Sequence, residues 1–305
     1  MAKKPRAEPW DTDWGVDVST PRELFRLISN LALLDQTRTY AWRGQNDATW
    51  RLTSSLFRRV EKIAGTPVTE DMLAAHEAQI LKEARGWGLG RDLGASATDL
   101  HMLATLQHHG VPTRLLDVTS NPMTALWFAI EEHKPDEFGR VRESPGVLFA
   151  IDVTGTDWYE TFQHNEARTW EHQSDPLGAS YKQALLRTRD GGFFRAFPAL
   201  PDERMKAQEG FFLGSTLPTM HRIPGVVGLN PVRGDAPGLE RLAKTAKPER
   251  ERGRPHAVPF CAIVISGALK KELRNPLKHT YNRRRRVLFP DIDGFRDGYA
   301  RDQLD

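Results

Sequence analysis

The helix expected over residues 122–133 is the segment that most constrains the fold. Ser120-Asn121-Pro122 supplies a cap followed by a proline in the first turn. The sequence PMTALWFAIEEH is then apolar on nearly every side at its start. A helix with this pattern has to be deeply buried, so other helices and strands must pack around it.

The other expected elements follow no regular alternation. TPRELFRLISNLAL predicts a helix with Thr20 as N-cap and Glu23 completing a capping box. Two more helices are expected over residues 71–87 and 96–109, the second ended by Gly110. TYAWRG, VLFAIDV, FFLGS and FCAIVIS predict strands. This order favours an α+β fold over a doubly wound sheet, with a mixed, largely antiparallel central sheet flanked by helices.

Length and composition suit one domain. Of the 305 residues, 1–13 are expected to form a disordered tail, and 14–305 one domain with a basic loop or insertion at about 225–257. No stretch approaches the roughly 18 apolar residues that span a membrane, and the start of the chain lacks the apolar core of a secretory signal. We therefore expect a cytoplasmic protein without a membrane partner.

The single cysteine excludes an internal disulfide, which fits a reducing compartment. Cys261 lies in the apolar run FCAIVIS, so we expect a buried small side chain and not a nucleophile.

Basic residues are unevenly distributed although the net charge is only +3. Residues 231–256 hold seven Lys or Arg against four acidic residues, and Arg283, Arg284, Arg285 and Arg286 are consecutive. Such clusters contact the phosphates of nucleic acids or form solvated loops, and both interpretations remain open.

The common catalytic motifs are absent. The sequence has no phosphate-binding G-x-x-x-x-G-K-[ST], no G-x-G-x-x-G after a strand, no G-x-S-x-G, no H-E-x-x-H and no C-x-x-C. Residues 290–294 look like the start of a calcium loop but lack its later glutamate. Classical nucleotide hydrolysis, zinc chemistry and serine hydrolysis are therefore disfavoured, and no metal is expected.

Trp42-Arg43-Gly44-Gln45 is the first of three polar segments. An arginine at the end of a buried strand needs an anionic partner. That partner is either a phosphate or carboxylate of a ligand or an internal ion pair with Asp117. Gly44 allows another group to approach the backbone closely.

The second polar segment, residues 107–120, connects two buried helices and is dense in His, Arg, Asp and hydroxyl side chains. It predicts a site held by rigid flanks, or alternatively a capping network with Asp117 paired to Arg114. The third segment, residues 204–211, places Gln208 and Glu209 just before an expected strand, facing a cleft or solvent.

These segments together resemble the FRG domain, a family named for a Phe-Arg-Gly motif, with Trp42 replacing the phenylalanine. The second segment resembles the motif Q-H-x-G-x-P-T-R-L-L-D-x-T-x-x-P-x-x-A-L-x-F-A, from Gln107 to Ala129. Arg204, Gln208, Gly210 and Phe212 resemble R-x-x-x-Q-x-G-x-F, and residues 288–294 resemble L-F-P-D-x-D-G. The likeness runs from about Trp14 to Arg301.

The order of the segments is also similar to that in ADP-ribosyltransferases, which implies a split sheet and NAD as substrate. That resemblance implies catalytic roles for Arg43, Thr119, Gln208 and Glu209. It implies cofactor contacts from the two main motifs, namely Arg43, Gly44, Gln45, His108, His109, Thr113, Arg114, Asp117, Thr119, Ser120 and Phe128. The acidic position falls on Gln208 or Glu209.

The first functional hypothesis is therefore an NAD-dependent ADP-ribosyltransferase-like enzyme, a toxin or anti-phage effector that modifies nucleic acid or protein. Its basic segments, Arg283 to Arg286 included, would hold the acidic target. The alternatives are a non-catalytic module binding a nucleotide or nucleic acid, and a metal-independent nuclease using His108 or His109. The first hypothesis requires Arg43, Thr119 and Ser120 to converge on one cavity.

Overall fold

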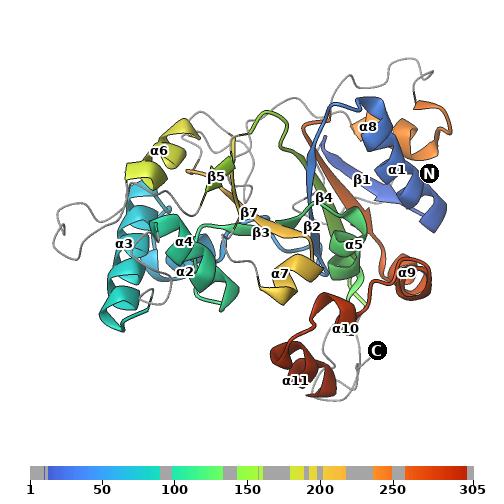
Figure 1. Cartoon of the computed structure of the whole chain (residues 1–305). Coiled ribbons are helices and arrows are strands. Elements are labelled where there is room, and N and C mark those ends of the chain that lie inside the picture. The colour runs from blue at the N-terminus through green and yellow to red at the C-terminus, as the bar shows by residue number, and fades with distance from the viewer. Residues whose placement is uncertain are drawn as a thin grey trace.

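In the computed structural model of the chain, one mixed sheet runs through the described residues (Figure 1). The structure describes residues 10, 13–89, 98–132, 143–156, 158–160, 179–188, 192–197, 202–217, 236–248 and 258–300. The eight strands of this part lie in the order β1-β8-β4-β2-β3-β7-β6-β5. Their bounds are β1 Gly15–Val18, β2 Tyr40–Gln45, β3 Leu116–Thr119, β4 Gly146–Asp152, β5 Trp158–Glu160, β6 Phe194–Phe197, β7 Gly210–Gly214 and β8 Phe260–Ile265.

The strand pairing confirms the predicted α+β class with a largely antiparallel sheet. Neighbours in the middle of the sheet are antiparallel, whereas β1 with β8 and β5 with β6 are parallel. The helices are α1 Pro21–Leu34, α2 Ser55–Ala64, α3 Glu70–Gly86, α4 Asp99–His108, α5 Pro122–Ile130, α6 Ala179–Arg187, α7 Glu203–Ala207, α8 Ala236–Lys244, α9 Gly267–His279, α10 Arg285–Leu288 and α11 Ile292–Ala300.

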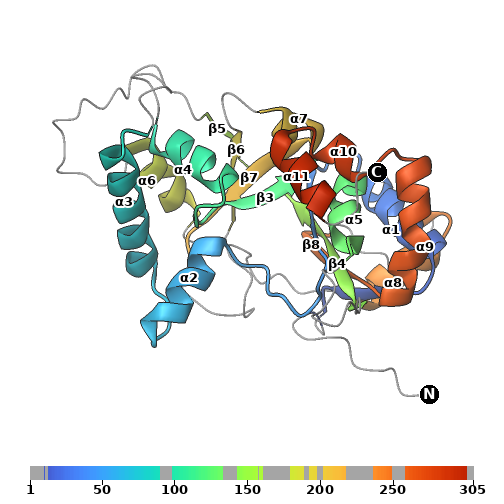
Figure 2. The same ribbon diagram turned by 90° about the horizontal axis from the view of Figure 1, so that it is seen from below.

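The sheet is narrowest between β2 and β3. These strands share one pairing, Trp42 with Thr119, whereas β2 pairs with β4 along its whole length. This junction separates a half made of β1, β8, β4 and β2 from a half made of β3, β7, β6 and β5. In Figures 1 and 2, α1, α5, α8 and α9 gather around the first half and α3, α4 and α6 around the second.

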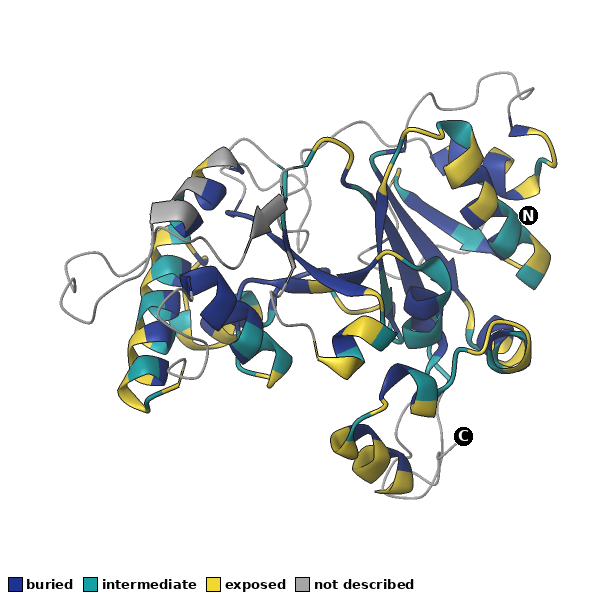
Figure 3. Cartoon of the chain, viewed as in Figure 1, coloured by how far each residue is buried: buried dark blue, intermediate teal, exposed yellow. Residues whose placement is uncertain are grey.

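Each half has a buried cluster of its own, and a further cluster, which includes Ala41, Phe149, Val118 and Leu213, spans the junction. Leu24, Trp42, Leu126 and Leu273 belong to one buried cluster, and Leu81, Leu103 and Phe212 belong to another. The central strands are buried along most of their length, whereas α11 is largely exposed (Figure 3). Cys261 is fully buried in β8, as expected.

Local sequence signals set the helix starts. The Thr20 hydroxyl accepts a hydrogen bond from the Glu23 amide at the start of α1. Asn121 caps α5, and its side chain accepts from the Met123 amide. The expected helix over residues 96–109 begins at Asp99 because Thr98 is its cap. Residue 96 lies outside the described residues.

Gly44 allows β2 to lie directly against α5. A Cβ atom at this position would lie 1.9 Å from the main-chain oxygen of Ala125 and 2.6 Å from the nitrogen of Ala129. No side chain fits into that space. The close approach predicted for this glycine is therefore made by the buried helix α5, which fixes α5 against the end of β2.

Three segments differ from expectation. Leu116–Thr119 was expected to be part of a connection, but it forms the short strand β3, because its main chain pairs with β7. Residues 236–244, within the expected loop or insertion, form α8 with Leu239 and Leu242 buried, and residues 225–235 and 249–257 lie outside the described residues. Trp10, placed in the expected tail, is buried against Phe149 with ring centroids 4.7 Å apart.

Among the described helices, none combines the length and the apolar character needed to cross a bilayer.

Candidate functional site

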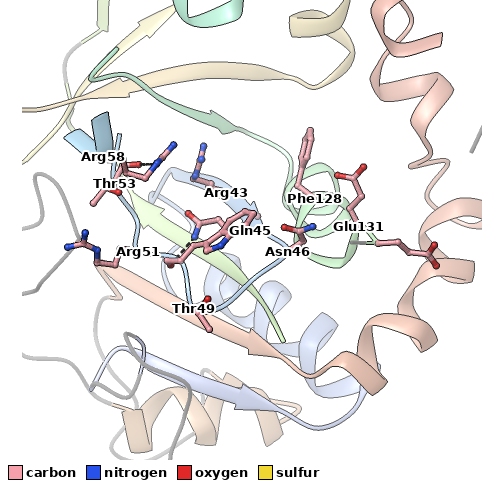
Figure 4. A pocket seen from close by; sticks show the side chains of 12 residues that line it. Arg43, Gln45, Asn46, Thr49, Arg51, Thr53, Arg58, Phe128 and Glu131 are labelled. Carbon is pink, nitrogen blue, oxygen red and sulfur yellow. Dashed lines mark hydrogen bonds between the residues drawn. The ribbon is translucent and has the colours of Figure 1, made fainter. Parts of the chain in front are cut away.

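A cavity of about 980 Å³ lies beside the junction between β2 and β3 (Figure 4). Its walls come from the end of β2 and the loop after it (Arg43, Gly44, Gln45, Asn46, Thr49, Trp50, Arg51 and Thr53), from Arg58 of α2, and from Phe128, Glu131 and Glu132 at the end of α5. In the view of Figure 4, Arg51 and Arg58 lie on one side, Glu131 lies on the other, and Arg43 lies between them. The cavity therefore joins a basic wall to an acidic one.

Arg43 links the two halves of the sheet at this point. Its Nη1 atom donates a 2.5 Å hydrogen bond to the main-chain oxygen of Asp117 and lies 3.8 Å from the Asp117 carboxylate. The side chain is 22% exposed, and its Nε atom has no partner among the described residues. Burial lowers the pKa of Arg43, Asp117 opposes that shift, and Arg58 adds to it.

A chain of hydrogen bonds from the second motif positions the Asp117 carboxylate. Asp117 accepts a 2.9 Å bond from the amide nitrogen of Gln107. The amide oxygen of Gln107 in turn accepts a 2.8 Å bond from the Thr113 hydroxyl, which is fully buried. Gln107, Thr113 and Asp117 thus act on the cavity through Arg43, although they do not line it.

Arg114, predicted to contact a cofactor, is buried and does not line the cavity. It is 1% exposed, and its Nε atom donates to Glu77 at 2.7 Å while Nη1 donates to Glu70 at 2.6 Å. Tyr181 donates to the other oxygen of Glu77 at 2.9 Å. The alternative pairing of Asp117 with Arg114 is also wrong, because both acidic partners of Arg114 come from α3.

Thr119 and Ser120 do not join Arg43 at the cavity. Thr119 pairs with Trp42, and successive side chains of a strand point to opposite faces, so Arg43 and Thr119 lie on different faces of the sheet. The Thr119 hydroxyl donates to the Gln208 main-chain oxygen at 2.7 Å, and Ser120 bonds the main-chain oxygen of Glu209. The structure therefore does not bring Arg43, Thr119 and Ser120 together at this cavity, contrary to the prediction.

Gln208 and Glu209 bind the C-terminal part of the chain and do not line the cavity. The Gln208 side chain donates to the main-chain oxygen of Leu288 at 2.9 Å. The Glu209 carboxylate accepts from Asn121 and Arg283, each at 2.9 Å, and its backbone has φ +51°. The Glu209 side chain thus connects the start of β7 to the segment before α10, and the Gln208 side chain connects it to α10 itself.

The two histidines at the end of α4 also lie outside the cavity wall. His108 Nε2 contacts the carboxylate of Asp202, which caps α7. The rings of His108 and His109 meet edge to face with centroids 5.4 Å apart. In the part of the chain that the structure describes, these contacts join α4 to α7.

The run Arg283 to Arg286, predicted to bind nucleic acid, does not form one continuous basic surface. Arg283 pairs with Glu209 and Arg285 with Glu131. Arg284 is partly buried, and Arg286 is exposed. Two of the four charges therefore have internal acidic partners.

The C-terminal helices instead complete the acidic wall of the cavity. Arg285 pairs with Glu131, and Arg274 pairs with Glu132 at 3.0 Å. Arg274 also donates to the main-chain oxygen of Ile130 at the end of α5, where a cation stabilises the helix dipole. Phe289, in the segment predicted from L-F-P-D-x-D-G, packs against Phe128 with ring centroids 5.9 Å apart.

Sequence reasoning missed most of the cavity wall outside Trp42–Gln45. Trp50, Thr53 and Arg58 follow the first motif within a turn and a helix that were not predicted. Glu131 and Glu132 directly follow the apolar helix, and that change from apolar to acidic residues was the one available signal.

The fold and site define an α+β protein with an arginine-lined cavity at a narrow junction of its sheet. Residues 38–137 match the family model of the FRG domain, which confirms the predicted resemblance over that segment. Both walls of the cavity lie within the matched residues. No curated protein and no solved structure matches the chain, so the resemblance to ADP-ribosyltransferases stays a prediction.

Proposed function

We propose that the cavity binds a nucleotide, with the phosphates against its arginines. Arg43, Arg51 and Arg58 line one wall, and guanidinium groups bind phosphate oxygens through paired hydrogen bonds. The guanidinium of Arg43 is largely shielded from water, which strengthens its interaction with an anion. This arginine wall is the observation that carries the proposal.

Two aromatic rings support recognition of a base. Trp50 is 53% exposed and lines the cavity together with Phe128. Exposed aromatic rings provide stacking faces for nucleobases of any sequence. The volume is near the upper end of the roughly 300–1,000 Å³ typical of ligand pockets, which suits a dinucleotide, and NAD is the first ligand to test.

Transfer of ADP-ribose from NAD is a second candidate function, and Glu131 and Glu132 favour it. A carboxylate near the ribose stabilises the positive charge that develops when the nicotinamide–ribose bond breaks. Sequence reasoning assigned this role to Gln208 or Glu209. Glu131 and Glu132 are better candidates because they line the cavity, opposite the arginine wall.

Calorimetric titration of the full chain with NAD, ATP and nicotinamide tests nucleotide binding. We expect NAD and ATP to bind and nicotinamide alone not to bind. Arg43→Gln should weaken NAD binding by about tenfold or more, because it removes a charge-assisted hydrogen bond. Arg22→Gln, at an exposed arginine of α1, is the matched control and should bind as the wild type does. Failure of both nucleotides to bind would end the proposal.

Transfer is tested separately with labelled NAD in the presence of RNA, DNA or a protein extract. Nicotinamide release and label transfer should be lost in Glu132→Gln and retained in Glu209→Gln. Binding of NAD without release would leave the protein as a nucleotide-binding module and exclude the transferase. Nicotinamide release that depends on Glu209 and not on Glu132 would assign the catalytic carboxylate to Glu209, as the sequence predicted.

A further inference from the structure

Arg43, at the end of β2, and Arg58, in α2, line the same cavity and share one acidic neighbour, Asp117. Asp117 stabilises the charged form of both guanidinium groups, while the charge of Arg58 disfavours that of Arg43. Burial disfavours both charges as well. By contrast, Arg51 on the same wall is paired with Glu61. Two guanidinium groups therefore share the single carboxylate of Asp117, which leaves one positive charge in excess among these three side chains.

Thr53 lies beside this pair and contributes an unused polar group. Its main-chain oxygen accepts a 2.5 Å hydrogen bond from Arg58 Nη1, which holds Arg58 toward the cavity. The residue lines the cavity and is 2% exposed, and its hydroxyl has no partner among the described residues. The Nε atom of Arg43 is the second buried donor without a partner on this wall. Buried polar groups are nearly always hydrogen-bonded, so these two atoms indicate a missing acceptor.

An anion between the arginines would neutralise the excess charge and accept from both unused donors. A phosphoryl group presents several oxygens in a tetrahedral arrangement, so it can bind two guanidinium groups and a hydroxyl at once. A carboxylate has two oxygens in one plane and matches a single guanidinium better. The number and origin of the donors therefore favour a phosphoryl group.

We propose that Arg43, Thr53 and Arg58 form a subsite for a doubly charged phosphoryl group. The subsite rests on the proposed nucleotide binding in the same cavity and specifies which ligands bind well there. Ligands with a diphosphate or a terminal phosphate monoester should bind more tightly than the corresponding nucleoside. The base would then lie toward Trp50 and Phe128, away from the subsite.

The test is a calorimetric comparison of adenosine, AMP, ADP, inorganic phosphate and inorganic pyrophosphate on the wild-type chain and its variants. Arg58→Gln should weaken the binding of ADP and of pyrophosphate by about tenfold or more. Thr53→Val should weaken the binding of both by about three- to tenfold. Arg59→Gln is the matched control, because Arg59 is the next residue of α2 and is exposed. Thr53→Ser retains the hydroxyl and should restore binding. Circular dichroism and a thermal melt of each variant establish that it folds.

The outcomes separate this inference from the nucleotide proposal. Tighter binding of ADP or AMP than adenosine, lost in Arg58→Gln and in Thr53→Val, supports the subsite. If Arg58→Gln weakens the binding of ADP more than that of AMP, the subsite binds a diphosphate. If it weakens the binding of both equally, the subsite binds a terminal phosphate. Pyrophosphate binding that depends on Arg58, without any nucleotide binding, keeps the subsite and ends the nucleotide proposal. Nucleotides that bind equally well to Arg58→Gln and Arg59→Gln would overturn the subsite alone.

Discussion

The guanidinium of Arg43 donates to the main-chain oxygen of Asp117, 74 positions later in the chain. The bond crosses the sheet beside the single pairing between β2 and β3. One side chain therefore both lines the cavity and joins the two halves of the sheet. The Asp117 carboxylate lies 3.8 Å from the same guanidinium and adds an ion pair between the Trp42–Gln45 motif and the second motif.

Substitution of Gly44 should destabilise the junction. In Gly44→Ala the new methyl group would overlap the main chain of α5, so we expect a loss of about 3 kcal/mol or more in the free energy of unfolding. Urea denaturation measures this loss. Gly86→Ala is the control. That glycine is the last residue of α3 and faces open space where a Cβ would lie, so alanine should be neutral or stabilising by up to about 1 kcal/mol. Equal stability of the two variants would contradict the close packing of β2 on α5.

Removal of Arg114 should unfold or strongly destabilise the chain without a specific effect on ligands. In Arg114→Met the carboxylate of Glu77 stays buried without its cation, which costs about 3–5 kcal/mol. Urea denaturation again measures the effect. The double variant Arg114→Met with Glu77→Met should recover much of the loss. A stable Arg114→Met variant with impaired nucleotide binding would instead restore Arg114 to the site.

Arg285 is predicted to act as a positioning residue for the acidic wall. Arg285→Met removes the partner of Glu131 and a cation stacked 5.2 Å from the ring centroid of Phe289, which itself contacts Phe128. We expect weaker binding of NAD, by about three- to tenfold, in calorimetric titration. The exposed neighbour provides the control variant, Arg286→Met. In a double-mutant cycle with Glu131→Gln, strict additivity would exclude coupling between Arg285 and Glu131.

Lys270 should make stability rise with pH above about 8. Its side chain is fully buried, its amino group donates to the main-chain oxygen of Asn46, and burial lowers its pKa to about 8 from 10.5. Below pH 8 both the folded and the unfolded chain hold the proton, and the folded chain bears the cost of a buried charge. Between pH 8 and 10.5 the unfolded chain holds more protons, so rising pH favours folding by up to about 1.4 kcal/mol per unit.

Urea denaturation of the wild type and of Lys270→Met between pH 7 and 10 measures this dependence. As the pH rises above about 8, the free energy of unfolding of the wild type should increase relative to that of Lys270→Met. A difference that stays constant over this range would show that Lys270 keeps its ordinary pKa.

Sequence patterns were sufficient for the local elements. Thr20 and Asn121 begin helices as predicted, because a hydroxyl or amide oxygen satisfies nearby amides with no contribution from distant residues. The strand at Tyr40–Gln45 and the buried helix after Pro122 follow equally from their apolar patterns. The second motif was also specific enough to indicate the FRG domain.

The amino-acid sequence by itself thus determined where the chain forms its main helices and strands, and that Arg43 lies in a polar site. Only the tertiary structure decided which polar groups meet: Arg114 with Glu77, Thr119 with Gln208, and Arg58 with Arg43 at the cavity. The physical reason is that local hydrogen bonds and periodicity act over a few residues. The partner of a buried charge, in contrast, depends on strand register and helix packing between segments far apart in the chain.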